Sequence, residues 1–288
     1  AEHTRAYLKV QDGCNQFCSY CIIPYARGRV RSRALESVVK EVKALAANGY
    51  QEVVLTGIHL SSYGVDTGES LLSLILAVHE VEGIKRIRLG SLEPRIITEE
   101  FAKTISGLPK MCPHFHLSLQ SGCNATLKRM NRKYDTARFR ESVRLLNQYF
   151  HRPAITTDLI CGFPEETEEE FGQTLAFIEE CGFAAMHIFP YSIRPGTKAA
   201  AMGQVPPAVK EQRTARAGQV AERMHRAYLE GCVGRTYPVL FEQPRDGRYF
   251  GHAPNYMEVG VAADGLHNVV KNVKIVGIDG EILRGELT

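Results

Sequence analysis

The sequence predicts an α/β protein in which a parallel sheet of six strands is followed by a small β-barrel. Three observations predict it: short apolar stretches recur along the chain, helical patterns separate them, and the pattern changes beyond Pro206-Pro207. Such alternation is typical of βα units, which form an open doubly wound sheet or a complete or partial barrel. With 288 residues, 44% of them hydrophobic, the chain can bury one large core and a second small one.

Each strand of the large domain is predicted from a short apolar run that polar or turn residues bound. The six strands are expected at Ala6–Gln11, Glu52–Gly57, Ile84–Ser91, His114–Gln120, Ala154–Cys161 and Ala184–Tyr191. Apolar residues at helical spacing predict helices at Leu35–Asn48, Leu71–Val81, Ala137–Tyr149 and Glu168–Cys181. The last helix has a clear start, because Thr167 and Glu170 have the spacing of a capping box.

The C-terminal part has a different pattern. A long helix is expected at Val209–Glu230, followed by short strands and by turns at Asp246-Gly247 and Asp279-Gly280. The strand signals lie at Val239–Phe241, Tyr256–Val259 and Val273–Val276, and they predict an antiparallel β-barrel of about 55 residues. We therefore divide the chain into residues 1–231, with the linker helix 207–231, and residues 232–288.

Composition limits the cellular location that is expected for the protein. The net charge of +3 is too small to indicate a partner, and no long apolar run or signal peptide is present. Five of the eight cysteines are scattered without the spacing of a disulfide framework. They are Cys112, Cys123, Cys161, Cys181 and Cys232. A reducing, cytoplasmic location without membrane association is therefore expected.

The other three cysteines form the strongest motif in the chain. Cys14, Cys18 and Cys21 follow the first predicted strand in a C-x3-C-x2-C pattern. Three thiolates can hold an iron–sulfur cubane and leave its fourth iron open for a ligand, which implies chemistry at that iron. The alternatives are a structural zinc site, which normally needs a fourth ligand, and disulfides, which cannot pair three thiols.

Polar residues gather at the predicted C-terminal ends of the other strands, where parallel α/β folds place their active sites. These residues are Thr56, Gly57, His59, Ser91, Glu93, Gln120, Asp158, Phe189 and Tyr191. Singly, Gly57 can serve a turn, Glu93 and Gln120 can fix loop backbone, and His59 can be an ordinary loop residue. Asp158 lies within an apolar strand, where a carboxylate is costly without a partner, so we favour a role in a site.

An arginine cluster follows the cysteines. Residues 1–35 contain six Lys or Arg against two acids, and Arg27, Arg29, Arg31 and Arg33 alternate along the chain. This pattern predicts an RNA-facing rim, although a merely solvated loop is an alternative. The predicted small barrel is less basic, with six Lys or Arg against seven Asp or Glu from residue 232 onward.

The cysteine motif, with Tyr20 before its last cysteine, resembles that of the radical S-adenosylmethionine (SAM) superfamily. Within it, the segment from Cys21 to Arg33 resembles the methylthiotransferases. Four further segments carry this similarity: Leu55–His59, Ile87–Pro94, Leu127–Arg132 and Gly162–Pro164. The Gly-Ile-His and Ser-Leu-Glu-Pro sequences are most similar to the MtaB-type branch, which acts on N6-threonylcarbamoyladenosine in tRNA.

This resemblance implies a partial (β/α)6 radical SAM barrel followed by a TRAM-like RNA-binding domain. It implies a [4Fe–4S] cluster on the three cysteines, with SAM chelating the open iron. Tyr20 would lie near the adenine, Thr56 and Gly57 near the methionine amino group, and Ser91 and Glu93 near the ribose. Gln120, Arg132 and Phe189 to Tyr191 would complete the pocket, and His59 and Asp158 are further candidates.

The implied reaction is transfer of a methylthio group to C2 of the modified adenosine at position 37 of the tRNA anticodon loop. A 5′-deoxyadenosyl radical would initiate it, and a separate protein would reduce the cluster. The alternatives are a relative that acts on isopentenyl-adenosine in tRNA or on a ribosomal protein aspartate. An alternative of a different functional class is an RNA-binding protein in which the cysteines bind a structural metal. No residue is assigned a catalytic role.

Two departures from the family pattern stand out. Glu165 occupies a loop position where the family commonly has glycine, which puts the conformation of that turn in doubt. No cysteine precedes Cys14, whereas full-length members carry an N-terminal domain that binds a second cluster. We therefore expect this chain to be a fragment that binds one cluster and cleaves SAM but does not complete methylthiolation.

Overall fold

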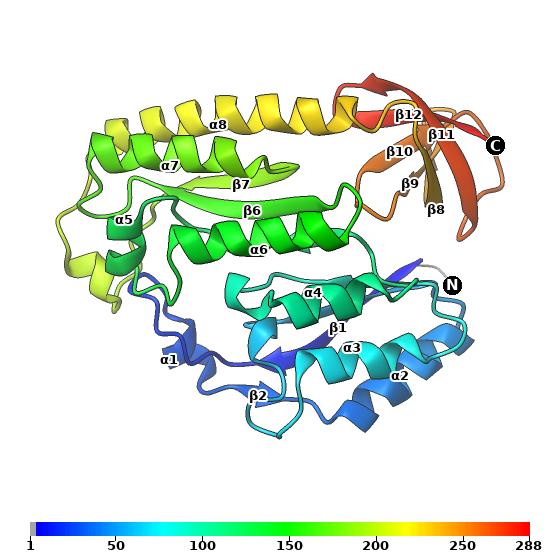
Figure 1. The fold of residues 1–288 in the computed structure, drawn as a ribbon, viewed down its shortest axis with the longest axis horizontal. Helices are drawn as coiled ribbons and strands as arrows, with labels where there is room; N and C mark the ends of the chain where they lie inside the picture. The colour runs from blue at the N-terminus through cyan, green and yellow to red at the C-terminus, as the bar shows by residue number, and fades with distance from the viewer. Residues whose placement is uncertain (1–3) are drawn as a thin grey trace.

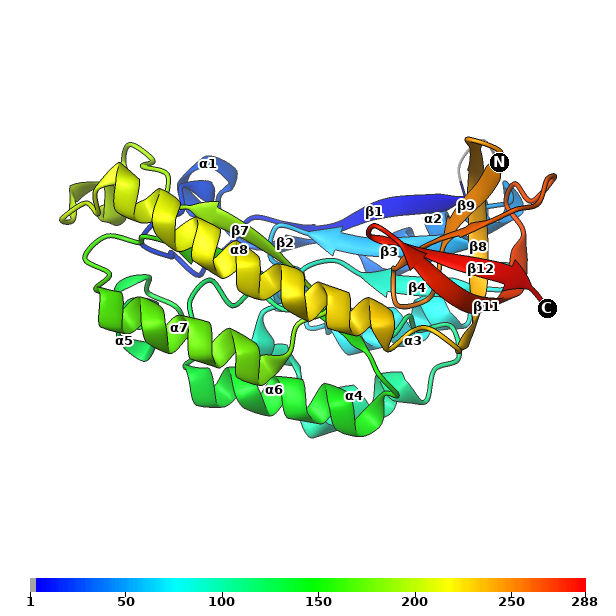
Figure 2. The same cartoon turned by 90° about the horizontal axis from the view of Figure 1, so that it is seen from above.

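The computed structural model describes residues 4–288, which form a partial barrel of parallel strands and a small closed barrel (Figure 1). The predicted first domain starts within residues 1–3, which lie outside the described residues. Figures 1 and 2 both place the small barrel at one end of the molecule and the short helix α1 (Ile23–Arg27) at the other.

The larger unit contains six parallel strands that follow one another in chain order. They are β1 (Arg5–Asp12), β3 (Glu52–Gly57), β4 (Arg86–Leu89), β5 (His114–His116), β6 (Ala154–Cys161) and β7 (Ala185–Pro190). Strands β1, β3 and β4 pair in parallel, as do β5, β6 and β7. All six match the strands predicted from the sequence, although β4 and β5 are shorter than predicted.

Isolated parallel bridges join the two sets of strands. Ile87 pairs with Met111 and Leu92 with Leu117, so the sheet continues from β4 to β5. Within residues 4–288, β1 and β7 do not pair with each other. The expectation of a partial barrel is therefore confirmed. The added strand β2 (Arg31–Ser32) pairs antiparallel with the end of β1.

Helices cover the outer face of this sheet (Figure 2). They are α2 (Leu35–Ala47), α3 (Leu71–His79), α4 (Glu99–Ser106), α5 (Asn124–Arg129), α6 (Thr136–Tyr149) and α7 (Glu168–Cys181). The capping box of Thr167 and Glu170 starts α7 as predicted. Three 3₁₀ turns occur at Leu60–Ser62, Pro94–Ile96 and Lys198–Ala201. Neither α4 nor α5 was included in the sequence prediction.

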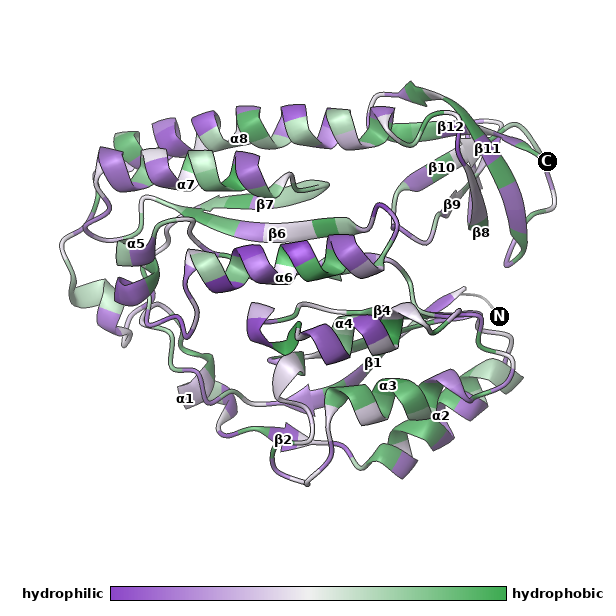
Figure 3. Cartoon of the chain, in the orientation of Figure 1, coloured by the Kyte–Doolittle hydropathy of each residue, from purple (hydrophilic) through white to green (hydrophobic). Residues whose placement is uncertain are grey.

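Side chains alternate along each strand between an apolar outer face and a polar inner face. We call the space inside the inner face the lumen. On β3, Val53 and Leu55 belong to the main hydrophobic core, whereas Glu52 and Thr56 alternate with them. On β4, Ile87 likewise belongs to the core. Figure 3 shows that α3 is almost wholly hydrophobic, and this helix contacts β4, α2 and α4.

Helix α8 (Pro207–Glu230) packs against β7 and leads into the small barrel. The barrel strands are β8 (Thr236–Arg245), β9 (Arg248–His252), β10 (Glu258–Val261), β11 (Val270–Asp279) and β12 (Ile282–Leu287). They close in the order β10-β12-β11-β8-β9. The barrel is mainly antiparallel as predicted, but β10 and β12 pair in parallel.

A buried ionic network, the floor network, fixes the small barrel at the N-terminal ends of the parallel strands. Glu52 is fully buried, and its Oε1 accepts hydrogen bonds from Arg5 Nε at 2.8 Å and Arg88 Nε at 2.7 Å. Arg5 also pairs with Glu242 of the small barrel at 2.7 Å. Arg88 donates to the carbonyl of Pro254 at 3.0 Å, so the same cations hold both units.

The network lies at the opposite end of the lumen from the loop that follows β1 (Figure 1). Arg86 donates from Nη1 to His252 O at 2.8 Å, which adds a further link to the small barrel. Within residues 4–288, none of the helices combines the length and hydrophobicity that a membrane span requires.

Candidate active site

The cysteine loop, residues 13–22, connects β1 to α1 and carries the three thiols of the sequence motif. At Gly13, φ is +71°, and a Cβ atom there would lie 1.9 Å from Arg29 O, so the position requires glycine. Cys14 N donates to Gly28 O at 3.0 Å and closes the loop. Cys14 is buried, whereas Cys18 and Cys21 are partly exposed, so ligand access is from one side.

The segment that follows α5 anchors the cysteine loop. Ser19 N donates to Met130 O at 2.9 Å, and Ser19 Oγ donates to Arg129 O at 2.7 Å. Asn131 Nδ2 donates to Phe17 O at 2.7 Å. The sequence analysis used this segment only for family similarity and for Arg132. Its hydrogen bonds show that it also determines the shape of the loop.

The three thiols fit a thiolate-bound cluster. Arg132 Nη1 donates to Cys18 Sγ at 3.2 Å, which places a cation beside the ligands. Burial raises the pKa of the Cys14 and Cys21 thiols, so both lose a proton when they bind metal. Within residues 4–288, no three His, Cys, Asp or Glu side chains are placed to hold one metal ion. Three thiols next to a cation are a donor set of the kind that iron–sulfur clusters use.

Gln11 connects the cysteine loop to the end of β3, and the sequence analysis missed it. Its buried side chain donates to Asp12 O at 2.8 Å and Gly13 O at 2.7 Å. Its Oε1 accepts a hydrogen bond from His59 N at 2.7 Å. A Cβ at Gly57 would lie 2.7 Å from that same oxygen, so the glycine permits the close approach. In the sequence, Gln11 is simply the last residue of a predicted strand, and no motif marks its role.

His59 and Glu93 lie close together at the rim of the lumen. Burial lowers the pKa of His59 to about 4, although nearby Glu93 opposes the shift, so the ring is neutral at physiological pH. His59 Nδ1 contacts Ser62 Oγ at 2.5 Å, and its buried Nε2 has no hydrogen-bond partner in the described chain. Glu93 is buried and accepts from Arg95 Nε at 2.7 Å. Sequence reasoning had not selected Arg95.

Arg132 is also close enough to His59 to affect its charge, and Gln120 lies in the loop that follows β5. Gln120 has φ of 69°, and its N–H donates to Asp158 O at 2.9 Å. Arg132 Nε donates to the Tyr134 hydroxyl at 3.1 Å, which fixes the guanidinium beside Cys18. On β3, Thr56 Oγ1 donates to the carbonyl of the adjacent strand.

Aromatic side chains link the cysteine loop to the ends of β6 and β7. The rings of Tyr20 and Phe163 lie 6.1 Å apart, and those of Phe163 and Tyr191 lie 5.4 Å apart, both edge to face. Phe189 is 50% exposed, and its ring stacks on that of His187. Tyr20 and Tyr191 are thus packed into this edge-to-face chain, whereas Phe189 presents an open aromatic surface.

The four predicted RNA-binding arginines differ in environment. Arg27 and Arg31 share Asp12, with N to O distances of 3.9 and 3.6 Å. The Arg29 guanidinium lies 5.9 Å from the centre of the Phe17 ring. Arg33 pairs with Glu41 on α2 at 2.7 Å, away from the cysteine loop.

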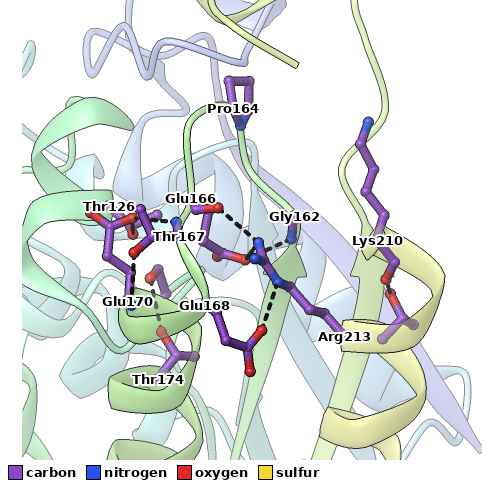
Figure 4. A network of polar contacts seen from close by, with 12 residues as sticks. Thr126, Gly162, Pro164, Glu166, Thr167, Glu168, Glu170, Thr174, Lys210 and Arg213 are labelled. Carbon is purple, nitrogen blue, oxygen red and sulfur yellow. Dashed lines mark hydrogen bonds and ion pairs between the residues drawn. The ribbon is translucent and has the colours of Figure 1, made fainter. Parts of the chain in front are cut away.

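A second buried ion pair fixes the loop between β6 and α7 to α8 (Figure 4). Arg213 Nη1 donates to both the carbonyl and the Oε1 of Glu166 at 2.9 Å, and Gly162 N donates to the same Oε1 at 3.0 Å. Arg213 Nε lies 3.6 Å from Glu168. At Glu165 the backbone has φ of 63°, so this glutamate adopts the left-handed turn that was in doubt.

The structure therefore brings together one group of the predicted residues and separates others. The cysteines, Tyr20, Gly57, His59, Glu93, Gln120 and Arg132 surround one end of the lumen. Asp158 lies deeper, where its carboxylate contacts His116 Nε2 at 3.1 Å. Ser91 is exposed, and Arg33 pairs with Glu41 on α2.

Comparison with protein families identifies a matching model. Residues 8–178 match the model described as "Radical SAM superfamily". Among solved structures, a radical SAM methyltransferase, TsrM from Kitasatospora setae, aligns with a TM-score of 0.57 and 20% identity, over 85% of this chain and 42% of that one. Coproporphyrinogen III oxidase from Escherichia coli aligns with a TM-score of 0.57 and 11% identity, over 87% and 66%. These two structures share the fold.

Sequence relatives are more similar. The threonylcarbamoyladenosine tRNA methylthiotransferase MtaB of Chlamydia pneumoniae is 41% identical over 99% of this chain and 68% of its own length. The MtaB of Bacillus subtilis is 41% identical over 90% and 59%. A tRNA-2-methylthio-N(6)-dimethylallyladenosine synthase of Pelotomaculum thermopropionicum is 38% identical over 97% and 63%. The chain thus spans about three fifths to two thirds of the length of these relatives.

Proposed function

Because this chain belongs to the radical SAM superfamily, and within it to the tRNA methylthiotransferases, we propose that it binds a [4Fe–4S] cluster on Cys14, Cys18 and Cys21 and cleaves SAM beside it. The protein would act on N6-threonylcarbamoyladenosine in the tRNA anticodon loop. The observation that carries this proposal is the loop of three thiols beside Arg132 at one end of a polar lumen. The names and the 41% identity of the MtaB relatives support this substrate.

The bound cluster would supply an electron that cleaves SAM to methionine and a 5′-deoxyadenosyl radical. The chain's own residues would position the reactants and exclude water. Arg132 would balance the charge of the thiolates, and Gln11 would keep the cysteine loop in register with the β3 loop. Neutral His59 can donate or accept a hydrogen bond without adding charge.

The cofactor pocket is proposed at the rim. Tyr20 would face the adenine, Thr56 and Gly57 the methionine amino group, and Ser91 and Glu93 the ribose. Gln120, Phe189 and Tyr191 would complete the pocket. Arg27 ends α1, Arg29 lies between α1 and β2, and Arg31 begins β2. These three arginines are proposed to contact RNA phosphates. Cytoplasmic location and a separate reductant protein are part of the same proposal.

The first test is formation of 5′-deoxyadenosine from SAM by the anaerobically reconstituted, reduced chain. We expect product from the wild type and none from Cys18→Ala, which lacks one ligand. Product from Cys18→Ala at the wild-type rate would contradict the cluster assignment. Zinc without iron in the purified chain would instead favour a structural metal.

Relatives named for dimethylallyladenosine make that nucleoside the second candidate substrate. Mass spectrometry of tRNA from cells with and without the full-length protein would separate the two. We expect the methylthio group on threonylcarbamoyladenosine. Its appearance on dimethylallyladenosine alone would assign the second substrate.

A further inference from the structure

A cavity lies in the lumen between β5–β7 and the small barrel, and the proposed function does not use it. Its volume is about 630 Å³. On the sheet side it is lined by His116, Thr156 and His187, and on the barrel side by Tyr256 and Glu258. Much of the wall is apolar, with Ala185, Met257 and Ile282, and four histidines place polar groups within it.

His187 lines this cavity, and Asp158 lies beside it on the neighbouring strand. They are paired in register on β6 and β7. Asp158 Oδ2 lies 3.1 Å from His116 Nε2, and His116 Nδ1 lies 2.9 Å from Thr156 Oγ1, so both groups orient the His116 ring. The His187 ring makes only ring contacts within residues 4–288, with His116 at 6.1 Å and Phe189 at 6.5 Å.

The register places this pair just below the rim. Strands rise about 3.3 Å per residue, so Asp158 lies about 7 Å below Ile160, and Thr156 about 13 Å below it. Ile160 N donates to Gln120 O at the rim. In adenine, C2 and the N6 substituent lie on the same Watson–Crick edge. An adenine that enters with this edge facing inward would present C2 at the rim and direct its N6 group into the lumen.

We propose that Asp158 and His187 read the N6 substituent of the target adenosine and select threonylcarbamoyl over dimethylallyl. Asp158 accepts a hydrogen bond from a carbamoyl N–H, and His187 donates to the threonine carboxylate. The inference rests on the proposed function and adds its specificity determinants. It gives Asp158 a role toward the substrate in place of the cofactor role expected from the sequence.

The charges that face this site are compatible with an anionic group on the β7 side. Three carboxylates of the small barrel line the far side of the cavity, namely those of Glu258, Asp279 and Glu281. Glu258 pairs with Arg245 at 3.1 Å, and Asp279 pairs with Arg248 at 2.7 Å. The repulsion by Glu258 and Asp279 is therefore reduced, whereas Glu281 lines the same cavity and opposes an anionic group.

An apolar substituent would make no hydrogen bond to Asp158 or His187. A dimethylallyl group offers no donor to Asp158 and no acceptor to His187, so it would displace water from both without replacing the hydrogen bonds. Sites built to hydrogen-bond a substrate group discriminate strongly against analogues that lack it. This asymmetry allows the two substrates to be separated by binding alone.

The test measures fluorescence anisotropy of the chain with three synthetic anticodon stem-loop RNAs. They differ only at the target adenosine, which carries threonylcarbamoyl, dimethylallyl or no N6 group. We expect the wild type to bind the threonylcarbamoyl RNA at least about tenfold more tightly than the dimethylallyl RNA, equivalent to one charge-assisted hydrogen bond. Asp158→Asn and His187→Ala should each reduce this preference below about threefold.

Binding of the unmodified RNA should stay the same in both variants, which separates substituent recognition from folding. Asp264→Asn, at an exposed loop position of the small barrel, is the matched control and should retain the full preference. The inference would be overturned if both variants kept the wild-type preference, or if the wild type bound the two modified RNAs equally. If SAM were still cleaved in that case, the proposed function would remain intact. If no RNA binds and no 5′-deoxyadenosine forms, both fail.

Discussion

At the scale of single residues, left-handed backbone recurs near the rim of the lumen. Among the described residues other than glycine, eight have positive φ, and three of them are Phe17 in the cysteine loop, Asn131 beside it and Gln120 beyond β5. Glu165, with φ of 63°, lies in the loop after β6. Residues other than glycine adopt this region at a cost, and such strain often marks functional sites. Contacts of the folded chain therefore stabilise the rim against the local backbone preference.

Glu165 offers a test of this cost. Glu165→Gly should raise the free energy of unfolding by about 1 kcal/mol, because glycine adopts the left-handed region without a Cβ penalty. Urea denaturation would measure the change. As a control, Glu222→Gly in the middle of α8 should lower stability by about 1 kcal/mol. A loss of stability in Glu165→Gly would show that the glutamate side chain, and not its backbone, determines this turn.

Gly13 provides a second prediction. Gly13→Ala should prevent the loop from closing on Arg29 O, and the iron content after anaerobic reconstitution should fall severalfold. Gly172→Ala is the control, since a Cβ at this helical position meets no atom within 4 Å. Equal iron loading in Gly13→Ala and wild type would show that the loop tolerates a different closure.

The sequence predicted the three thiols of the site, but it did not predict the residues that hold the cysteine loop in place. Cys14, Cys18 and Cys21 have a spacing that indicates metal binding by itself. Gln11 and Asn131 act through hydrogen bonds to loop backbone, and such bonds depend on tertiary contacts that no local pattern records. The roles proposed for Thr56 and Ser91 stay predictions.

At the scale of elements, the strong periodic segments were predicted correctly and the short ones were missed. Helix α4 begins at the Thr98 cap but has only eight residues. Strands β9 and β12 each contain a glycine, which lowers the strand signal. At Gly251, a Cβ would lie 2.1 Å from Leu240 O, so close strand packing explains a residue that the sequence pattern disfavours.

The attachment of α8 can be tested through two arginines on the same helix. Arg213→Ala should lower the free energy of unfolding by about 3 kcal/mol, because it leaves the buried Glu166 without its cation. Arg216→Ala removes a partly exposed pair with Glu168 and should cost under about 1 kcal/mol. Chemical denaturation of both variants would compare them. Similar losses would mean that burial does not govern the Arg213 pair.

At the scale of the whole molecule, the floor network joins the two units. The sequence predicted both units but not their arrangement, because the sequence of a buried strand does not show which residues its arginines contact. Arg86 and Arg88 reach backbone carbonyls of the small barrel across the end of the lumen. The Tyr256 ring also lies 4.5 Å from the Arg88 guanidinium. We therefore expect the two units to unfold together at neutral pH.

At acidic pH, the two units should unfold separately. Burial alone would raise the pKa of Glu52, but Arg88 and Arg5 dominate and hold it at about 2, below the ordinary value of 4.5. A lowered folded-state pKa gives stability that is present above pH 4.5 and lost as pH falls toward 2. The loss should reach about 3 kcal/mol. Urea denaturation across this range should show it, together with a separate transition for the small barrel.

Glu52→Gln should be less stable at neutral pH and should show a flatter dependence between pH 4.5 and 2. Glu41→Gln, which removes an exposed pair with Arg33, should keep the wild-type profile. An identical pH profile for Glu52→Gln and wild type would assign the acid sensitivity to other carboxylates.

The alternation of the strands has a consequence for the history of such proteins. Leu8, Val53 and Ile87 contribute to the core that the helices cover, whereas Asp158 and His187 are outside it. Substitutions at lumen positions outside this core and outside the floor network can therefore change what the barrel accepts with little loss of folding free energy. Descendants of one ancestor could exchange one modified nucleoside for another by drift at a few inner positions, while selection for foldability preserved the shell.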